Sequence, residues 1–339
     1  MHSTSRRSML KLALAGTIGA PAILKSRRAE AAEFTLKYAN NAPLTHPLTV
    51  NITHAADAIR KATGGRVAIQ VFPNNELGGD TDMLAQLRAG ALDFFTQSPL
   101  ILSTLVPNAA ISGIGFAFKN YAHVWDAMDG SLGSYVRAQI KSKGLIAFPK
   151  IFDNGFRQIT SSTHPIKTPA DLKSFKIRVP PSPLWTSMFK DFGAEPLSID
   201  FSEIYTALQT RIADGEENPL VTIDSAKLYE VQKYVAMTNH MWDGFWFLAN
   251  PGSWNRLPPD VQKVIEEKIT AAAVQERIDV ARLNASLEKN LIAKGMAFNT
   301  VEAGAFQDRL QQAGFYTAWK ARFGAAPWAL LEKSAGRKL

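Results

Sequence analysis

An arginine within a short apolar run is the residue whose type and setting most directly suggest chemistry. Arg178 stands between two β-branched residues in Lys176-Ile177-Arg178-Val179-Pro180, a pattern that predicts a short buried strand ended by proline. A buried guanidinium is costly unless an anion meets it. Further along, we predict that the segment Asp214–Pro219 is a polar loop, which ends in an Asn218-Pro219 step. We expect Arg178 and Asn218 to face one cleft and hold a carboxylate there; an internal pair between Arg178 and an Asp or Glu is the alternative.

Most other chemistries lack the residues they need. The sequence has no cysteine, which excludes thiol catalysis, disulfides and thiolate metal sites. Its six histidines show no metal-site spacing, and no zinc-protease, hydrolase or P-loop motif occurs. Asp214, Glu216 and Glu217 form an acidic cluster that could bind a metal or act as acid and base, although such clusters are more often solvated loops. We expect no enzyme activity, no metal and no cofactor.

The elements before the arginine are expected to complete the cleft. Alternating and helical patterns predict strand, helix, strand, helix, strand over residues 34–96, which is the order of a mainly parallel α/β sheet. Ligands of such sheets bind at the carboxyl ends of strands, which selects Asn40, Asn41, Gln97 and Ser98. In the later strand predicted at 245–249, alternation favours Trp246 for the cleft, with its two phenylalanine neighbours in the core.

The second half of the chain repeats this order from about residue 155. An extended pattern at 145–152 leads to a predicted turn at 154–160 that feeds another extended segment. Helices are expected at 121–143, 183–192, 201–212 and 303–328, and strands at 195–199, 234–238 and 245–249. The longest helical pattern opens at Leu257-Pro258-Pro259-Asp260 and runs towards Lys294, with Gly295 as its cap. At 1.5 Å per residue it would be about 50 Å long, enough to lie across two domains.

The amino-terminal segment predicts where the protein works. Residues 1–32 carry Arg6-Arg7 before a weakly hydrophobic run that is too short to span a bilayer, followed by small residues suited to cleavage. We interpret them as a twin-arginine export signal; a basic amphipathic start to a cytosolic protein is the alternative. The full chain has a net charge of +8, and six basic residues and one acidic residue lie in this segment. The remainder has 32 basic and 29 acidic residues, which gives no electrostatic case for nucleic-acid binding.

Several ordered motifs between about Phe34 and Leu330 resemble the solute-binding proteins of TRAP transporters, the DctP family. The motifs are Thr63-Gly64-Gly65-Arg66-Val67, Glu76-Leu77-Gly78-Gly79-Asp80, Gly155-Phe156-Arg157, Leu172 to Pro180, Gly193-Ala194-Glu195-Pro196, Phe201 to Tyr205, Ala207 to Thr210, Asp214 to Pro219 and Tyr229 to Tyr234.

The resemblance implies a two-domain periplasmic-binding-protein-like α/β fold with hinge strands and a long helix shared by both domains. Domain I would comprise residues 33–154 and about 244–283, and domain II residues 155–243 and about 284–339. The substrate would be a small organic acid, and the partner a TRAP permease in the membrane. Arg178 matches the family's carboxylate-binding arginine, Asn218 an asparagine that bonds the same group, and Arg157 a second polar contact. Positions matching Asn41, Gln97 and Phe201 often line the cleft.

These expectations describe a periplasmic binding protein, monomeric and not inserted in the membrane after export. A ligand-binding module for a sensor would share every cleft residue, so the sequence does not separate it from a transport protein. An exported hydrolase or lyase acting through Asp214, Glu216 or Glu217 is the alternative from another class.

Overall fold

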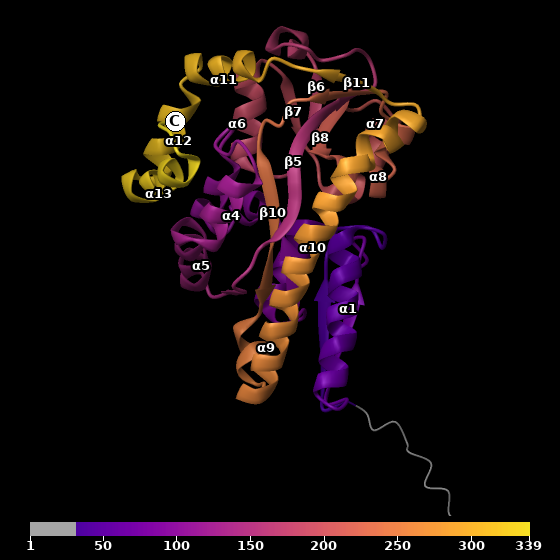
Figure 1. Ribbon diagram of the computed structural model, residues 1–339, viewed down its shortest axis with the longest axis vertical. Coiled ribbons are helices and arrows are strands. Elements are labelled where there is room, and N and C mark those ends of the chain that lie inside the picture. The colour runs from indigo at the N-terminus through magenta and orange to yellow at the C-terminus, as the bar shows by residue number, and fades with distance from the viewer. Residues whose placement is uncertain (1–31) are drawn as a thin grey trace, which may run out of the picture. The chain divides into compact units, whose positions relative to one another are not determined.

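The strands of the computed structural model, which describes residues 32–339, form one mixed sheet (Figure 1). The predicted export signal therefore lies outside the described residues, apart from Ala32. The strands are β1 (Phe34–Ala39), β2 (Val67–Phe72), β3 (Phe94–Gln97), β4 (Ile146–Ala147), β5 (Phe152–Ser161), β6 (Lys176–Val179), β7 (Glu195–Ser198), β8 (Gly215–Pro219), β9 (Tyr234–Met237), β10 (Trp242–Ala249) and β11 (Ala297–Thr300). The main path is β2-β1-β3-β10-β5-β8-β6-β7, while β4 pairs with β10, and β9 pairs with both β5 and β11.

Two long strands connect the halves of this sheet. Strand β10 pairs with β3 through residues 246–249 and with β5 through residues 242–245. Strand β5 pairs with β10 through residues 152–156 and with β8 through residues 157–161. In the first half β1 is parallel to β2 and β3, and in the second β6 is parallel to β7 and β8. The predicted α/β order is thus present in both halves, which β5 and β10 join.

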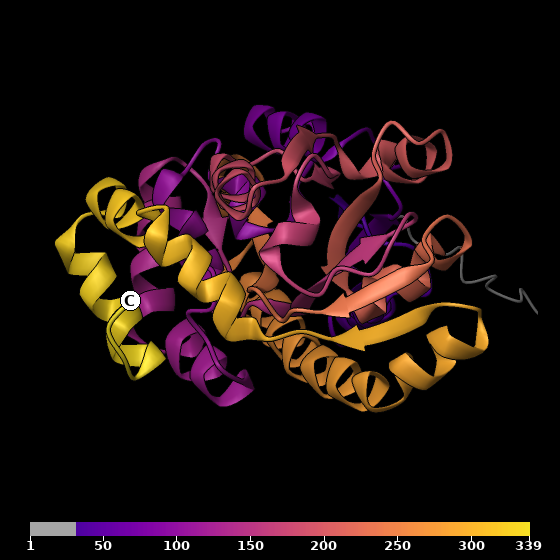
Figure 2. The same ribbon diagram turned by 90° about the horizontal axis from the view of Figure 1, so that it is seen from above.

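Helices cover both halves. They are α1 (Pro47–Ala62), α2 (Asp80–Ala89), α3 (Pro99–Leu102), α4 (Tyr121–Asp129), α5 (Ser131–Ser142), α6 (Pro183–Phe192), α7 (Ile204–Gln209), α8 (Leu220–Ser225), α9 (Pro251–Asn255), α10 (Pro259–Ala293), α11 (Ala303–Gln312), α12 (Phe315–Phe323) and α13 (Ala325–Ala335). Short 3-10 turns lie at Pro107–Gly113, Pro169–Leu172, Phe201–Glu203 and Leu228–Glu230. Helix α13 packs on α4 and α5, so the end of the chain covers the helices of the first half (Figure 2).

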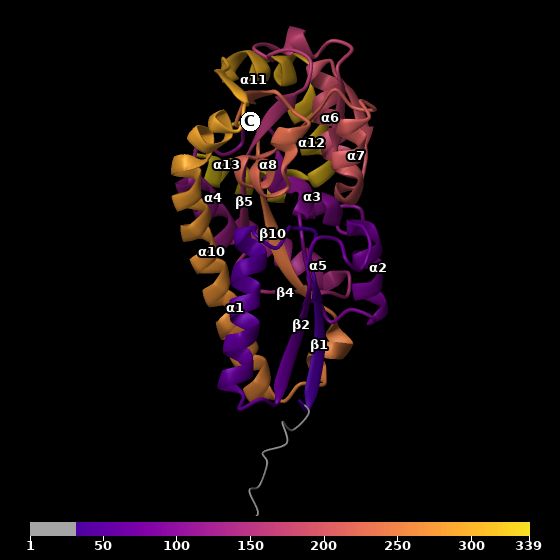
Figure 3. The same cartoon turned by 90° about the vertical axis from the view of Figure 1, so that its right-hand side faces the viewer.

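The long helix predicted to open at residues 257–260 is present as α10, with 35 residues. It lies beside α1, and its first half packs Ile265 and Ile269 into the core of the first half of the sheet (Figure 3). Its last turns place Leu287 and Leu291 in a second core with β9 and α8. One helix thus contributes to two of the three hydrophobic cores in the described residues.

Several local predictions differ from the structure, and the helix expected at 303–328 is divided into α11, α12 and α13. The single helix expected at 121–143 is divided at Gly130, where an added Cβ would lie 2.3 Å from the backbone oxygen of Asp126. The helix expected at 201–212 is a 3-10 turn followed by a helix that ends at Gln209. The turn expected at 154–160 belongs to β5, because pairing with β8 and β10 supplies its backbone partners. The break at Gly130 is local, whereas the pairing of β5 depends on strands distant in the sequence.

A pair of buried carboxyl groups links β5 to α10. The backbone N–H of Asp153 donates to Glu276 at 2.9 Å, and each side chain keeps one buried oxygen without a hydrogen bond to a described residue. Burial raises the pKa of Asp153 to about 7 and also raises that of Glu276. Because the folded state holds these protons more tightly than the unfolded state, stability is expected to fall as the pH rises from about 4 through 7.

Candidate functional site

Arg178 lies in β6, where its neighbours Ile177 and Val179 are core residues. Its side chain is 1% exposed, and Nε donates to the backbone oxygen of Ile199 at 2.9 Å. Both terminal nitrogens, Nη1 and Nη2, are buried and have no hydrogen-bond partner among residues 32–339. Burial lowers the pKa of Arg178 to about 10, so the group remains a cation at neutral pH. The site therefore presents a buried positive charge with two free nitrogens.

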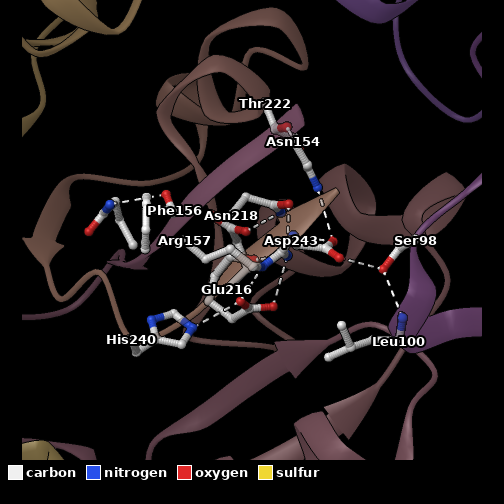
Figure 4. Close-up of polar contacts among 12 residues, drawn as sticks. Ser98, Leu100, Asn154, Phe156, Arg157, Glu216, Asn218, Thr222, His240 and Asp243 are labelled. Carbon is white, nitrogen blue, oxygen red and sulfur yellow. Dashed lines mark hydrogen bonds and ion pairs between the residues drawn. The ribbon is translucent and has the colours of Figure 1, made fainter. Parts of the chain in front are cut away.

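Arg157, by contrast, has its counter-ions within the fold. Its Nε lies 2.5 Å and its Nη2 2.9 Å from the carboxylate oxygens of Glu217, and Nη1 lies 3.4 Å from Asp243 (Figure 4). Its guanidinium carbon lies 4.8 Å from the ring centre of Trp185. Burial opposes the charge, but Glu217 holds the pKa of Arg157 above its usual value. The internal ion pair considered for Arg178 is formed by Arg157 instead.

The segment predicted as a polar loop at 214–219 is the buried strand β8. It pairs with β5 on one side and β6 on the other, with Glu216 opposite Arg178 in register. Glu216 and Glu217 are fully buried, so the expectation of a solvated acidic loop was wrong. Thr160 donates to Glu216 at 2.7 Å, and His240 lies 3.1 Å from Glu217. The two glutamates occupy a strand interior because these partners satisfy them.

Asn218 lies near the end of β8 and borders the same cavity as Arg157 and Arg178. Its Oδ1 accepts from Nη2 of Arg157 at 2.9 Å, and its Nδ2 donates to Glu216 at 2.5 Å. An amide nitrogen carries two hydrogens, so one donor of Asn218 is still available. Arg157 and Glu216 therefore fix the orientation of this amide.

These residues border a cavity of about 30 Å³. Six of the eight predicted binding residues line it: Asn41, Ser98, Arg157, Arg178, Phe201 and Asn218. The guanidinium carbon of Arg178 lies 5.8 Å from the ring centre of Phe201. The expected meeting of Arg178 and Asn218 at one cavity is thus present.

Gln97 and Trp246 do not line this cavity. Gln97 is fully buried and donates to the backbone oxygen of Asp80 at 3.2 Å. It therefore helps to position Asp80, which lines the cavity. Trp246 is fully buried in the core, opposite Gln97 in register. Phe245 borders the cavity instead, as does Asp243 two residues earlier. Strand alternation holds, but the local sequence does not reveal which face of β10 meets the cavity.

The remaining polar lining was not predicted and comes mostly from the ends of elements. It consists of His46, Asp80, Asn154, Thr222 and Asp243. Asp80 begins α2, and both of its carboxylate oxygens lie 3.0 Å from the amide nitrogen of Asn41. His46 caps α1 by accepting from the backbone N–H of Leu48 at 3.1 Å. The predicted helix starts at both positions were the only sequence signals that could have pointed to these side chains.

A chain of hydrogen bonds spans the two halves of the sheet at the cavity (Figure 4). Ser98, after β3, donates to Asp243 at 2.8 Å, and Asn154 donates to the other oxygen of Asp243 at 3.1 Å. Thr222, from α8, donates in turn to Asn154 at 3.1 Å. Burial raises the pKa of Asp243 to about 6, so these donors share a carboxylate near neutral pH. This network fixes the cavity wall formed by β5 and β10.

The acidic residues considered for catalysis do not face the cavity. Glu216 and Glu217 are used within the sheet, and the carboxylate of Asp214 accepts from the backbone N–H of Lys176 at 3.0 Å. In residues 32–339, no group of three or more His, Cys, Asp or Glu side chains is placed to hold a metal ion. Nor does that part of the chain contain a helix long and apolar enough to cross a bilayer. The fold and its cavity, which contains a buried arginine with unpartnered terminal nitrogens, define a ligand-binding protein of the α/β class.

Comparison with known proteins places the chain within this class. A family model described as bacterial extracellular solute-binding protein, family 7 (DctP), matches residues 38–316. The 2,3-diketo-L-gulonate-binding periplasmic protein YiaO of Escherichia coli is 32% identical over 255 residues, which cover 75% of this chain and 77% of that protein. An uncharacterised protein of Sinorhizobium fredii is 35% identical over 277 residues, and the match spans 82% of this chain but only 51% of that protein.

A solved structure has the same fold. The TRAP periplasmic solute-binding protein of Sulfurospirillum deleyianum, with bound succinate, matches with a TM-score of 0.85 and 26% identity over 91% of this chain and 100% of that one. The chain therefore belongs to the DctP family of TRAP periplasmic solute-binding proteins. Members of this family are transport components rather than enzymes, which agrees with the expectation from the sequence.

Proposed function

We propose that the protein captures a small organic acid in this cavity and delivers it to a TRAP permease. The observation that carries the proposal is the pair of buried, unpartnered nitrogens Nη1 and Nη2 of Arg178. A planar guanidinium with two free nitrogens matches the two oxygens of a carboxylate, so one bidentate contact neutralises the charge and orients the ligand. Succinate and 2,3-diketo-L-gulonate, which similar proteins bind or are named for, are both carboxylates.

The neighbours of Arg178 have distinct roles in this proposal. The second N–H of Asn218 donates to the same carboxylate, and the ring of Phe201 supports the guanidinium plane. Arg157 borders the cavity but is already paired with Glu217, so it orients Asn218 and adds a weaker direct contact. Gln97 acts indirectly, through its bond to Asp80.

The energetics require more than this anchor. A ligand bound with micromolar affinity needs about 8 kcal/mol of net binding free energy. Two charge-assisted hydrogen bonds supply roughly 1.5–3 kcal/mol each, before the cost of immobilising the ligand. The difference must come from contacts that form when the two halves close over the ligand.

Closure depends on the division into two domains, which we propose as 33–154 with about 244–283, and 155–243 with about 284–339. Strands β5 and β10, which pass from one half of the sheet to the other, are suited to act as hinges. A contact across the entrance supports a closed form: the backbone N–H of Asp80 donates to Asp200 at 3.0 Å. In the closed form, surfaces of both domains would together contact the permease.

The cellular setting follows from the same proposal. The chain is a periplasmic-type binding protein, and we propose that the twin-arginine signal in residues 1–32 directs its export and that the mature protein acts as a monomer. Neither nucleic acid nor a cofactor has a part in this function.

A ligand screen tests the proposal. Purified protein is scanned by thermal shift against dicarboxylates, sugar acids, keto acids and aromatic acids, and hits are titrated by calorimetry. We expect at least one class to raise the melting temperature, and the Arg178→Met variant to lose that response. Absence of any response, or a response that Arg178→Met retains, would contradict a carboxylate site at Arg178.

A further inference from the structure

The cavity lining includes polar groups of another kind than the guanidinium of Arg178. His46 lies there, 1% exposed, with its ring edge-on to Phe245 at 6.2 Å between ring centres. Its Nδ1 accepts from the backbone N–H of Leu48, so the proton of the neutral ring is on Nε2. Nε2 is buried and has no hydrogen-bond partner among the described residues. Burial lowers the pKa of His46 to about 4, so the ring is an uncharged donor at neutral pH.

Two buried carboxyl groups share the cavity with His46. Asp80 is fully buried, and its side-chain oxygens receive hydrogen bonds from a single amide, that of Asn41. A carboxylate can accept about four hydrogen bonds, so Asp80 retains acceptor capacity. Asp243 is 1% exposed, and its nearest cation, Arg157, is held mainly by Glu217. Among the described residues, the cavity thus has one cation without an ion pair, Arg178, one carboxyl group without an ion pair, Asp80, and a second carboxyl group, Asp243, that shares Arg157 with Glu217.

This distribution discriminates between organic acids. Burial raises the pKa of Asp80 to about 7 and that of Asp243 to about 6, so above about pH 7 both carboxyl groups are negatively charged. A dicarboxylate anchored on Arg178 would then bring a second negative charge towards them, and the other groups at hand are the neutral His46 and Arg157, which is already paired with Glu217. A buried like-charge contact of this kind is strongly unfavourable. A hydroxyl group, however, can accept from Nε2 of His46 and donate to a carboxylate in the same position. The empty hydrogen-bonding positions are therefore complementary to hydroxyls rather than to a second carboxylate.

We propose that His46, Asp80 and Asp243 form a hydroxyl-binding subsite, which makes the ligand a hydroxylated monocarboxylate rather than a dicarboxylate. The inference rests on the proposed function, since it takes Arg178 as the carboxylate anchor. His46 and Asp80 then act as specificity-determining residues supplied by the first half of the sheet.

Calorimetry with acids matched in chain length tests the subsite on the full mature protein. The pairs are glycerate with malonate, erythronate with succinate, and gluconate with adipate, and butyrate controls for the carboxylate alone. We expect the tightest ligand to be a hydroxy acid that binds at least a hundredfold more tightly than its dicarboxylate partner. A dicarboxylate as the tightest ligand, or no binding by any hydroxy acid, would overturn the inference.

Two variants assign the effect to residues. His46→Asn keeps an oxygen to cap α1 but does not extend an Nε2 donor into the cavity, so hydroxy-acid affinity should fall about tenfold while butyrate affinity is unchanged. His54→Asn, at an exposed position on the same helix, is the matched control and should bind as the wild type does. Asp80→Asn should raise succinate affinity when binding is measured at pH 8, above the value of about 7 to which burial raises the pKa of Asp80, because it removes a buried negative charge. Unchanged affinities in both His46→Asn and Asp80→Asn would overturn the subsite.

The two levels of the proposal fail differently. If a dicarboxylate binds most tightly and Arg178→Met abolishes its binding, the subsite is wrong and the carboxylate anchor stands. If no acid binds, or if binding is independent of Arg178, the anchor itself is wrong and the subsite falls with it.

Discussion

Replacing Arg178 with methionine separates a ligand-binding role from a structural one, because the two roles predict opposite changes in stability. Burial lowers the pKa of Arg178 to about 10 from its usual value, a change equivalent to roughly 3 kcal/mol of destabilisation of the buried cation. Methionine removes that penalty and fills a similar volume, but loses the bond to Ile199, worth about 1 kcal/mol. We expect the ligand-free variant to gain about 1–2 kcal/mol, which raises its melting temperature by about 2–4 °C.

Binding should change in the opposite direction. Truncating one partner of a buried charge pair typically costs about 2–5 kcal/mol, so the affinity for the acid should fall by about 30-fold to several thousandfold. Scanning calorimetry measures the first effect, and titration calorimetry with the best ligand from the screen measures the second. A variant that melts several degrees lower and still binds the acid would refute the reasoning and make Arg178 a structural residue.

Arg157→Met is the matched control, since it removes a buried arginine of similar exposure. Arg157 pairs with Glu217 at 2.5 Å, and its loss leaves that carboxylate buried and uncompensated. Breaking such a pair costs about 3–5 kcal/mol, so this variant should melt several degrees lower than the wild type. If Arg157→Met and Arg178→Met change the melting temperature equally, the difference in ion pairing between the two arginines does not govern stability.

Two further predictions concern pH and export. Glu276→Gln removes one member of the buried carboxyl pair with Asp153, so the loss of stability between about pH 4 and 7 should become smaller, as thermal melts across that range would show. Glu288→Gln, at an exposed position on the same helix, should leave the wild-type slope, and an equal slope for all three proteins would exclude the pair as its cause. Replacing Arg6 and Arg7 with lysine should leave precursor in the cytoplasm on cell fractionation, whereas normal periplasmic yield would argue against the twin-arginine route.

Local sequence patterns predicted helices and strands well where the residues of the element itself carry the pattern. The alternating strand at 34–39, the helix from Pro47 and the helix that opens at 257–260 all begin where the structure has them, because proline at a helix start and apolar periodicity are local properties. The prediction of a loop at 214–219 was wrong. Two glutamates and an asparagine usually indicate solvent exposure, but here buried partners such as Arg157 and Thr160 bind the glutamates, and the local sequence does not reveal these partners.

The sequence alone determined that an arginine on a buried strand needs an anion, that Asn218 belongs to the same site, and that the family is DctP. The sequence did not determine which of the two arginines lacks an internal ion-pair partner and can bind a ligand. Arg157 and Arg178 are both buried, and only the tertiary structure shows that Glu217 pairs with the first and leaves the terminal nitrogens of the second without partners. Ion pairing depends on the approach of side chains distant in sequence, and no local pattern encodes it. The same reason explains why His46 and Asp80 emerged as cavity residues only when the two halves of the sheet were seen together.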